Sequence, residues 1–289
     1  RLALHEGVPA EQILCGSGAA DLIFRLVWAK KPRRALVTAP TFAEYATALK
    51  SVGCTVERFF LREQEDFAVT DAFCAAIRPG VDMVFLCQPN NPTGQLTALP
   101  LVEQILHRCA ACGTLLVVDE CFLDFLPDHA LHTAKGLLGE GDLVILKAFT
   151  KLYGMAGVRL GYALSADTAL LEQMQACGQP WGVSSLAQAA GLAALEETAY
   201  VEKVRALIAE QRPRLTAGLR ALGLRVLDGR ANYLLFQAPE TLGETLRQRG
   251  AVLRSCANYP GLGPGWYRTA VRTGPEDEQL LKLLAEVLE

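Results

Sequence analysis

Short apolar runs alternate with helical patterns through the first two-thirds of this 289-residue chain. Apolar runs of this length, separated by amphipathic segments, predict a largely parallel β-sheet covered by helices. We therefore expect an α/β fold. The expected strands are 34–38, 82–87, 114–119, 142–147 and 158–164, and the expected helices between them are 19–28, 43–52, 99–112 and 167–176.

The pattern changes near Ser184, where longer helical segments begin. Residues 200–222 carry charges among apolar residues at helical spacing, and we expect this helix to link two domains. The predicted large domain covers residues 1–198, and the linking helix with a small α+β C-terminal domain covers 199–289. In the small domain we expect strands at 224–227, 232–237, 251–254 and 267–272, an interruption at 241–249 and a closing helix at 276–289.

Composition narrows the classes of function. Hydrophobic residues make up 51% of the chain, which is enough for a large core. The net charge of -3 offers no basic surface, so nucleic acid is not an expected partner. No apolar run reaches the roughly 18 residues that a membrane span needs, and the first residues lack the apolar core of a secretory signal. We expect a cytoplasmic protein that does not bind membranes.

The nine cysteines lie scattered among apolar residues. Their odd number and surroundings predict reduced thiols, not a disulfide framework. Cys109 and Cys112 have the spacing of a zinc or redox pair, and His107 is nearby. They fall within a predicted helix, however, and no second ligand pair is close in the sequence. We expect helix packing there and no metal.

The segment 147–162, KAFTKLYGMAGVRLGY, is the most informative about chemistry. Lys151 follows a predicted buried strand, and Arg159 comes eight positions later among small residues. A lysine that forms a Schiff base needs the floor of a pocket, where its amine can be neutral and nucleophilic. The arginine would supply a fixed cation for a phosphate. Taken alone, the same spacing is also common in purely structural segments.

Three further segments place small or polar groups at turns and strand ends. Residues 16–21, GSGAAD, open a predicted helix and would offer backbone amides to an anion. Asn91 lies in the turn PNNPTG after a predicted strand. Asp119 ends another buried strand, which is where α/β sheets bind ligands and where an unpaired carboxylate is costly. Each segment by itself could be no more than a helix start, a turn or a strand end.

Taken in their order along the chain, the four segments resemble the motifs of class I and II aminotransferases over residues 16–162. The resemblance implies the aminotransferase fold, pyridoxal 5'-phosphate as the cofactor, and Lys151 as the catalytic lysine that holds it. It also implies the other cofactor contacts: the backbone amides of Gly18, Ala19 and Ala20 with Thr150 and Arg159 for the phosphate, Phe42 stacked on the ring, Asn91 at the phenolic oxygen and Asp119 at the ring nitrogen.

Two subfamilies that act on phosphorylated amino acids look nearest, the threonine-phosphate decarboxylases of cobamide biosynthesis and the histidinol-phosphate aminotransferases. By this resemblance, Arg268 would bind the substrate carboxylate and Arg254 the substrate phosphate, with Asn91 also in contact with the substrate. Both arginines could equally be surface charges at strand ends.

Several features resemble the decarboxylases more closely, among them the segments 179–188 and 254–262. Phe122 stands where the aminotransferases usually carry a tyrosine whose hydroxyl bonds the cofactor, and Ala148 lacks a hydroxyl that many relatives use on the phosphate. We therefore expect decarboxylation of O-phospho-L-threonine, with transamination of histidinol phosphate as the alternative. The sequence leaves open which Cα bond of the substrate faces the cofactor.

The resemblance also implies a homodimer. Relatives carry, before the position of Arg1, an N-terminal arm that lines the pocket and reaches across the dimer, and we expect the activity of this chain to depend on such an arm. A remote alternative is a sensor domain that binds the cofactor without turnover. Such regulators carry a DNA-binding helix-turn-helix, and none is visible here.

Overall fold

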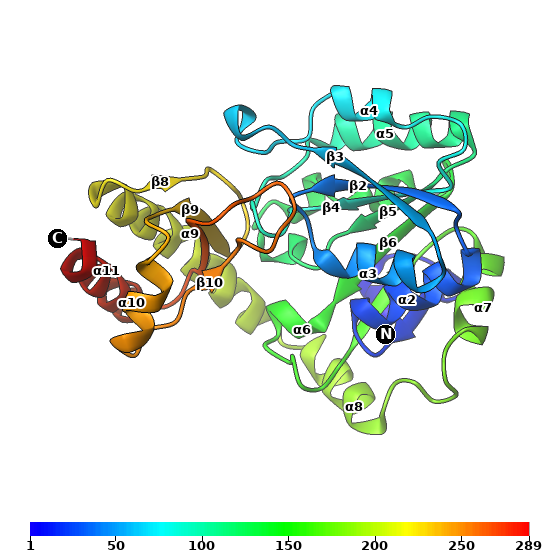
Figure 1. The fold of residues 1–289 in the computed structure, drawn as a ribbon. Helices are drawn as coiled ribbons and strands as arrows, with labels where there is room; N and C mark the ends of the chain where they lie inside the picture. The colour runs from blue at the N-terminus through cyan, green and yellow to red at the C-terminus, as the bar shows by residue number, and fades with distance from the viewer. Residues whose placement is uncertain (289) are drawn as a thin grey trace.

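The computed structural model describes residues 1–288. It contains two β-sheets, and helix α9 (Thr198–Ala221) runs from the part with the larger sheet to the part with the smaller one (Figure 1). The larger sheet has seven strands in the order β1-β7-β6-β5-β4-β2-β3. Its strands are β1 (Ile13–Gly16), β2 (Arg34–Ala39), β3 (Thr55–Phe60), β4 (Met83–Cys87), β5 (Leu115–Asp119), β6 (Leu143–Ala148) and β7 (Gly161–Leu164).

The large sheet is mostly parallel, as predicted. Strands β3, β2, β4, β5 and β6 pair in parallel, whereas β7 runs antiparallel to both β6 and β1. Strand β7 starts at Gly161 and not at Val158, because Arg159 has a left-handed backbone with φ 62° that ends the preceding turn. Strand β3 was not predicted from the sequence; it lies at the sheet edge and carries charged and partly exposed residues.

Helices cover both faces of this sheet (Figure 1). Alternate residues of each strand belong to opposite cores; in β4, for example, Phe85 faces one core and Val84 the other. This is why continuous apolar runs mark the buried strands. On one face lie α2 (Ala19–Lys30), α3 (Ala43–Ser51) and α7 (Thr168–Ala176), and on the other α4 (Ala72–Ala76), α5 (Leu99–Cys112) and α8 (Ser185–Ala194).

Helix α5 shows how local sequence sets helix ends. Pro100 lies in its first turn, where no intrahelical donor is lost, and Gly113 ends it with φ 66°. The other short helices of the large part are α1 (Leu2–Glu6) and α6 (Phe149–Leu152). Among residues 1–288, no helix is both long enough and apolar enough to cross a membrane.

The smaller sheet is antiparallel, in the order β10-β11-β9-β8. The predicted strand 251–254 is wrong in most of its length, because Ala251 donates its backbone N–H to Leu246 and so closes the preceding helix. The predicted division into residues 1–198 and 199–289 stays a prediction. The elements here are β8 (Arg225–Val226), β9 (Tyr233–Gln237), α10 (Leu242–Gln248), β10 (Arg254–Ser255), β11 (Trp266–Ala270) and α11 (Gly274–Leu288).

Candidate active site

A cavity of about 340 Å³ lies at the carboxyl ends of β4, β5 and β6. Cys87, Asp119 and Ala148, the last residues of these strands, all line it. Strands that run in parallel end at one edge of the sheet, which is where α/β folds bind ligands. The predicted site residues in its wall are Ala19, Ala20, Phe42, Asn91, Asp119, Thr150, Lys151, Arg159, Arg254 and Arg268.

One end of this cavity suits a phosphate. Helix α2 begins here, with Gly18 before its first residue, and the guanidinium of Arg159 donates to the backbone oxygens of Ser17 (3.4 Å) and Ala156 (3.0 Å). A Cβ at Gly18 would lie 2.9 Å from Arg159 Nη2, so a larger residue would displace the guanidinium. The helix start, this cation and the Thr150 hydroxyl together offer an anion several donors.

The Asp119 carboxylate lies buried in the same cavity, with 5% of its surface exposed. Its Oδ2 accepts from the Tyr45 hydroxyl at 2.6 Å, and its Oδ1 accepts from the Cys121 backbone N–H at 3.0 Å. Among residues 1–288, no basic side chain lies within ion-pair distance of it. A buried carboxylate without a cation is costly. The site therefore fits a ligand that brings a positive charge, such as a protonated ring nitrogen.

Two lysines lie in or just after β6, Lys147 within the strand and Lys151 in the following helix α6, and their surroundings differ. Lys147 is buried and ion-paired with Asp124 at 2.9 Å and Glu6 at 3.4 Å. Burial lowers the pKa of Lys147, but the surrounding carboxylates outweigh burial and raise it, so this amine stays charged. Lys151, in α6, is exposed to the cavity, and its Nζ lies 5.6 Å from the ring centre of Phe122. Of the two, only Lys151 is placed to react with a ligand.

The side chain of Asn91 lines the cavity and is hydrogen-bonded to residues of the C-terminal part of the chain. Its Oδ1 accepts from the Arg268 guanidinium and from the Tyr259 hydroxyl, the latter at 3.4 Å. The amide nitrogen is thereby left as a donor toward the cavity, as the predicted bond to a phenolic oxygen requires. The Arg268 guanidinium also lies over the Tyr233 ring, 4.9 Å from its centre.

Arg254 and Arg268 face each other as Cα partners in the antiparallel pair β10–β11. Arg254 donates to Asn258 Oδ1 at 3.2 Å and lies 5.7 Å from the Tyr259 ring centre. Both arginines line the cavity, and in the described part of the chain neither has a carboxylate within ion-pair distance. Two neighbouring guanidinium groups without counter-charges are able to bind two anionic groups.

A second cavity, of about 600 Å³, continues from the first toward α11. The two cavities share Phe122, Lys151, Arg254 and Arg268. These four side chains therefore lie where the two cavities meet.

Several residues of the site were not predicted from the sequence. Tyr45, Tyr233 and Cys121 carry no motif, and each reaches the site through packing. Tyr259 lies within the segment 254–262 that favoured one subfamily, but nothing there indicated its contact with Asn91. Spacing along the chain predicts strand ends well and predicts such cross-element contacts poorly.

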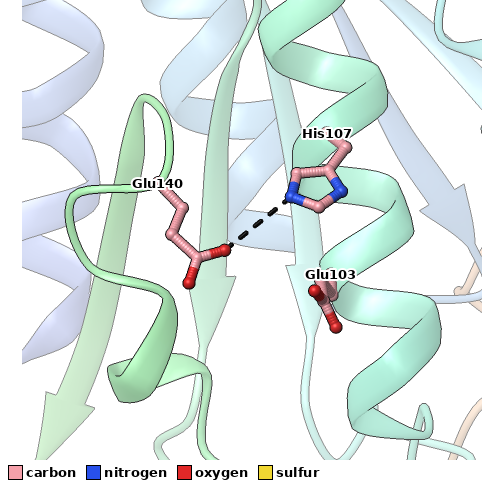
Figure 2. Close-up of side chains that lie close together, drawn as sticks. All are labelled: Glu103, His107 and Glu140. Carbon is pink, nitrogen blue, oxygen red and sulfur yellow. Dashed lines mark ion pairs between the residues drawn. The ribbon is translucent and has the colours of Figure 1, made fainter.

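The side chain of His107 lies near carboxylates and not near the Cys109 and Cys112 thiols. His107 Nε2 lies 3.7 Å from Glu140, with Glu103 one helical turn before it, at the protein surface (Figure 2). Cys109 is buried in the core, and the Cys112 thiol lies 3.7 Å from the backbone oxygen of Ile77. The structure does not bring the histidine and the two thiols together. All nine cysteines are free.

Comparisons with known proteins show the family of this chain. The family model "Aminotransferase class I and II" matches residues 4–287. The chain is 40% identical over 291 residues to the threonine-phosphate decarboxylase of Salmonella typhimurium, covering 99% of this chain and 80% of that protein. It is 34% identical to the histidinol-phosphate aminotransferase of Symbiobacterium thermophilum, covering 100% and 79%. The crystal structure of the histidinol-phosphate aminotransferase from Clostridium acetobutylicum superimposes with a TM-score of 0.93 at 25% identity, covering 99% of this chain and 86% of that one.

Proposed function

The chain belongs to the class I and II aminotransferase family of pyridoxal-phosphate enzymes, and from this premise we propose that it decarboxylates O-phospho-L-threonine to (R)-1-aminopropan-2-yl phosphate, in cobalamin biosynthesis. The observation that carries the proposal is the pair Arg254 and Arg268, two guanidinium groups without counter-charges beside Lys151. The substrate has two anionic groups, a carboxylate and a phosphate. The relative from Salmonella typhimurium, named for this activity, supports the same substrate.

The residues of the cavity fit pyridoxal phosphate. We assign its phosphate to the start of α2 with Thr150 and Arg159, and its ring nitrogen to the buried Asp119 carboxylate. We assign its phenolic oxygen to Asn91. Phe42, which lines the cavity and packs edge-on against Tyr45 with ring centres 5.5 Å apart, would stack on the ring. Lys151 would hold it covalently.

The same residues would direct the reaction. Bound pyridoxal phosphate would supply an electron sink for a bond at the substrate Cα, and the orientation of the substrate would decide which bond is weakened. Arg268 holds the carboxylate and Arg254 the phosphate, so the two arginines fix how the substrate is turned. In the proposed reaction the bond from Cα to the carboxylate carbon would break, carbon dioxide would leave, and the electron pair of that bond would remain for a proton to bind at Cα. Lys151 is placed to deliver the proton that Cα then takes up.

Transamination of histidinol phosphate is the second candidate, supported by the 34% identical relative of that name. The same two arginines could bind its phosphate and the carboxylate of the amino acceptor in turn. Phe122 argues against it, because a phenylalanine beside Lys151 supplies no hydroxyl to bond the cofactor. Loss of that donor alters the electronics of the ring, which favours the lyase over the transferase.

Product analysis on the full-length gene product tests the proposal. With phosphothreonine we expect one carbon dioxide released for each amino-alcohol phosphate formed, without any added oxo acid. With histidinol phosphate and 2-oxoglutarate we expect little turnover. Clean transamination of histidinol phosphate, with no carbon dioxide from phosphothreonine, would overturn the decarboxylase and support the second candidate.

We also propose that the protein is a homodimer that uses an apolar face around α8. Trp181 is 95% exposed, Leu186 71% and Leu192 51%, which is unusual for large apolar side chains. Leu192 also lines an apolar cavity of about 480 Å³ between α8 and α1, together with Leu2 and Val183. A second copy of the chain is the expected occupant, since members of this family typically pair.

A further inference from the structure

The hydroxyl of Tyr45 makes the shortest contact to the Asp119 carboxylate, 2.6 Å from Oδ2. Tyr45 lies in α3, has no exposed surface, and stacks on Phe85 with ring centres 4.7 Å apart. Asp119 comes 74 residues later, at the end of β5. The tyrosine ring is thus held by the core, and its hydroxyl is aimed at a group in the wall of the cavity.

We propose that Tyr45 is a positioning residue for the cofactor: its hydroxyl holds the Asp119 carboxylate in place, aimed at the ring nitrogen. This inference rests on the proposed cofactor site. One oxygen of Asp119 is bonded by Tyr45 and the other by the Cys121 backbone, so the carboxylate cannot rotate without losing a donor. Its remaining lone pairs are left for one cationic donor from a ligand.

The Tyr45 hydroxyl is the main side-chain hydrogen-bond donor to the Asp119 carboxylate. The other titratable groups around Asp119 are the thiols of Cys87 and Cys121, the buried Tyr233 hydroxyl, and Lys151, which lines the same cavity. Burial, and to a lesser degree the charge of Asp119, raises the pKa of Cys87 to about 12. The same two causes raise the pKa of Cys121 well above its usual value, so both thiols stay neutral. Burial and the same carboxylate raise the pKa of the Tyr45 hydroxyl as well, so it remains a proton donor throughout the working pH range.

The consequence is electronic as well as geometric. A carboxylate that loses a hydrogen-bond donor becomes more basic and takes a larger share of the proton between it and a ring nitrogen. The ring then carries less positive charge and draws electrons less strongly. Any other acidic proton on the bound cofactor should accordingly be released at a higher pH.

The test compares two buried tyrosines in the cofactor-loaded protein, Tyr45→Phe and Tyr162→Phe. Each variant removes one hydroxyl that donates to a buried carboxylate, Asp119 in the first case and Glu6 in the second. Tyr162→Phe should therefore lose about as much stability as Tyr45→Phe while leaving the hydrogen bonds of Asp119 unchanged. The pH titration of the cofactor's visible absorption, the cofactor dissociation constant and kcat are measured for both variants and the unchanged protein.

For Tyr45→Phe we expect the absorption midpoint to rise by about half a pH unit or more, cofactor to dissociate ~10-fold more readily, and kcat to fall ~10-fold. Tyr162→Phe should leave the midpoint where it is. If the two variants behave alike, with an unmoved midpoint, Tyr45 serves only in packing and the inference is wrong. If the unchanged protein binds no pyridoxal phosphate at all, the proposed function itself fails, which is a distinct result.

Discussion

Arg254 and Arg268 are direct Cα partners across β10 and β11, although loop residues separate the two strands in the sequence. The register of this one antiparallel pair sets two guanidinium groups beside each other at the mouth of the cavity that holds Lys151. Neighbouring cations repel each other unless anions lie between them. A substrate with two negative groups would relieve this repulsion, and this relationship gives the first prediction.

Replacing the two arginines should have different effects. Arg268→Ala removes the cation that also orders Asn91, so we expect activity to fall ~100-fold or more on every substrate. Arg254→Ala should raise KM for phosphothreonine ~10- to 100-fold and change turnover of unphosphorylated threonine little. Steady-state kinetics with both substrates checks this. Arg247→Ala, on the exposed face of α10, is the control. Equal losses on both substrates for Arg254→Ala would argue against a phosphate contact.

Lys151 should be the lysine that binds the cofactor covalently. The unchanged protein should absorb visible light once loaded with pyridoxal phosphate, and borohydride should fix the cofactor to the peptide that contains residue 151. Lys151→Ala should abolish the fixed adduct, because Lys147 is charged and paired with Asp124. Mass spectrometry of the digested protein reads the result, with Lys30→Ala as a surface control. An adduct on another lysine in Lys151→Ala would contradict the assignment.

The exposed apolar face around α8 should be the dimer contact. Glutamates introduced on this face would have to be buried against the second copy of the chain, at a cost of several kcal/mol. We expect the double variant Trp181→Glu and Leu192→Glu to sediment as a monomer at micromolar concentration. Leu131→Glu changes a residue of similar exposure elsewhere and should stay dimeric. An unchanged protein that is already monomeric with cofactor bound would contradict the proposed dimer.

The buried ion pair between Glu6 of α1 and Lys147 of β6 should make the free energy of unfolding depend on pH in the acidic range. Burial raises the pKa of Glu6, but Lys147, Tyr162 and Lys135 outweigh it and lower the pKa to about 2. A carboxyl group whose pKa is lower in the folded than in the unfolded protein stabilises the fold at pH values above its unfolded pKa of about 4.3. This stabilisation is lost as the pH falls toward 2. Urea unfolding should show Glu6→Gln less stable by about 3 kcal/mol at pH 7, with the difference shrinking below about pH 4.5.

A matched control for this pair is Glu196→Gln, since Glu196 pairs with Arg1 at the surface and both side chains are more than half exposed. Its effect should stay under about 1 kcal/mol at every pH. A difference between Glu6→Gln and the unchanged protein that does not vary between pH 7 and pH 3.5 would show that the carboxylate charge plays no part.

The sequence alone determined the layered α/β fold, because apolar runs of strand length between amphipathic segments have few other ways to be buried. It also located Asp119 and Lys151, since residues that follow parallel strands share one edge of the sheet. Local patterns reach no further than a strand and its following turn.

Only the tertiary structure decided which distant groups meet. The donation from Tyr45 to Asp119, the register of Arg254 with Arg268 and the pairing of Glu6 with Lys147 each join different elements. Such contacts depend on how helices pack on the sheet and on which residues of two strands are opposite, and a shift of one residue would reverse the side-chain directions. Different helix packings and strand registers are compatible with the same hydrophobic periodicity in each segment, so the sequence pattern does not predict these contacts.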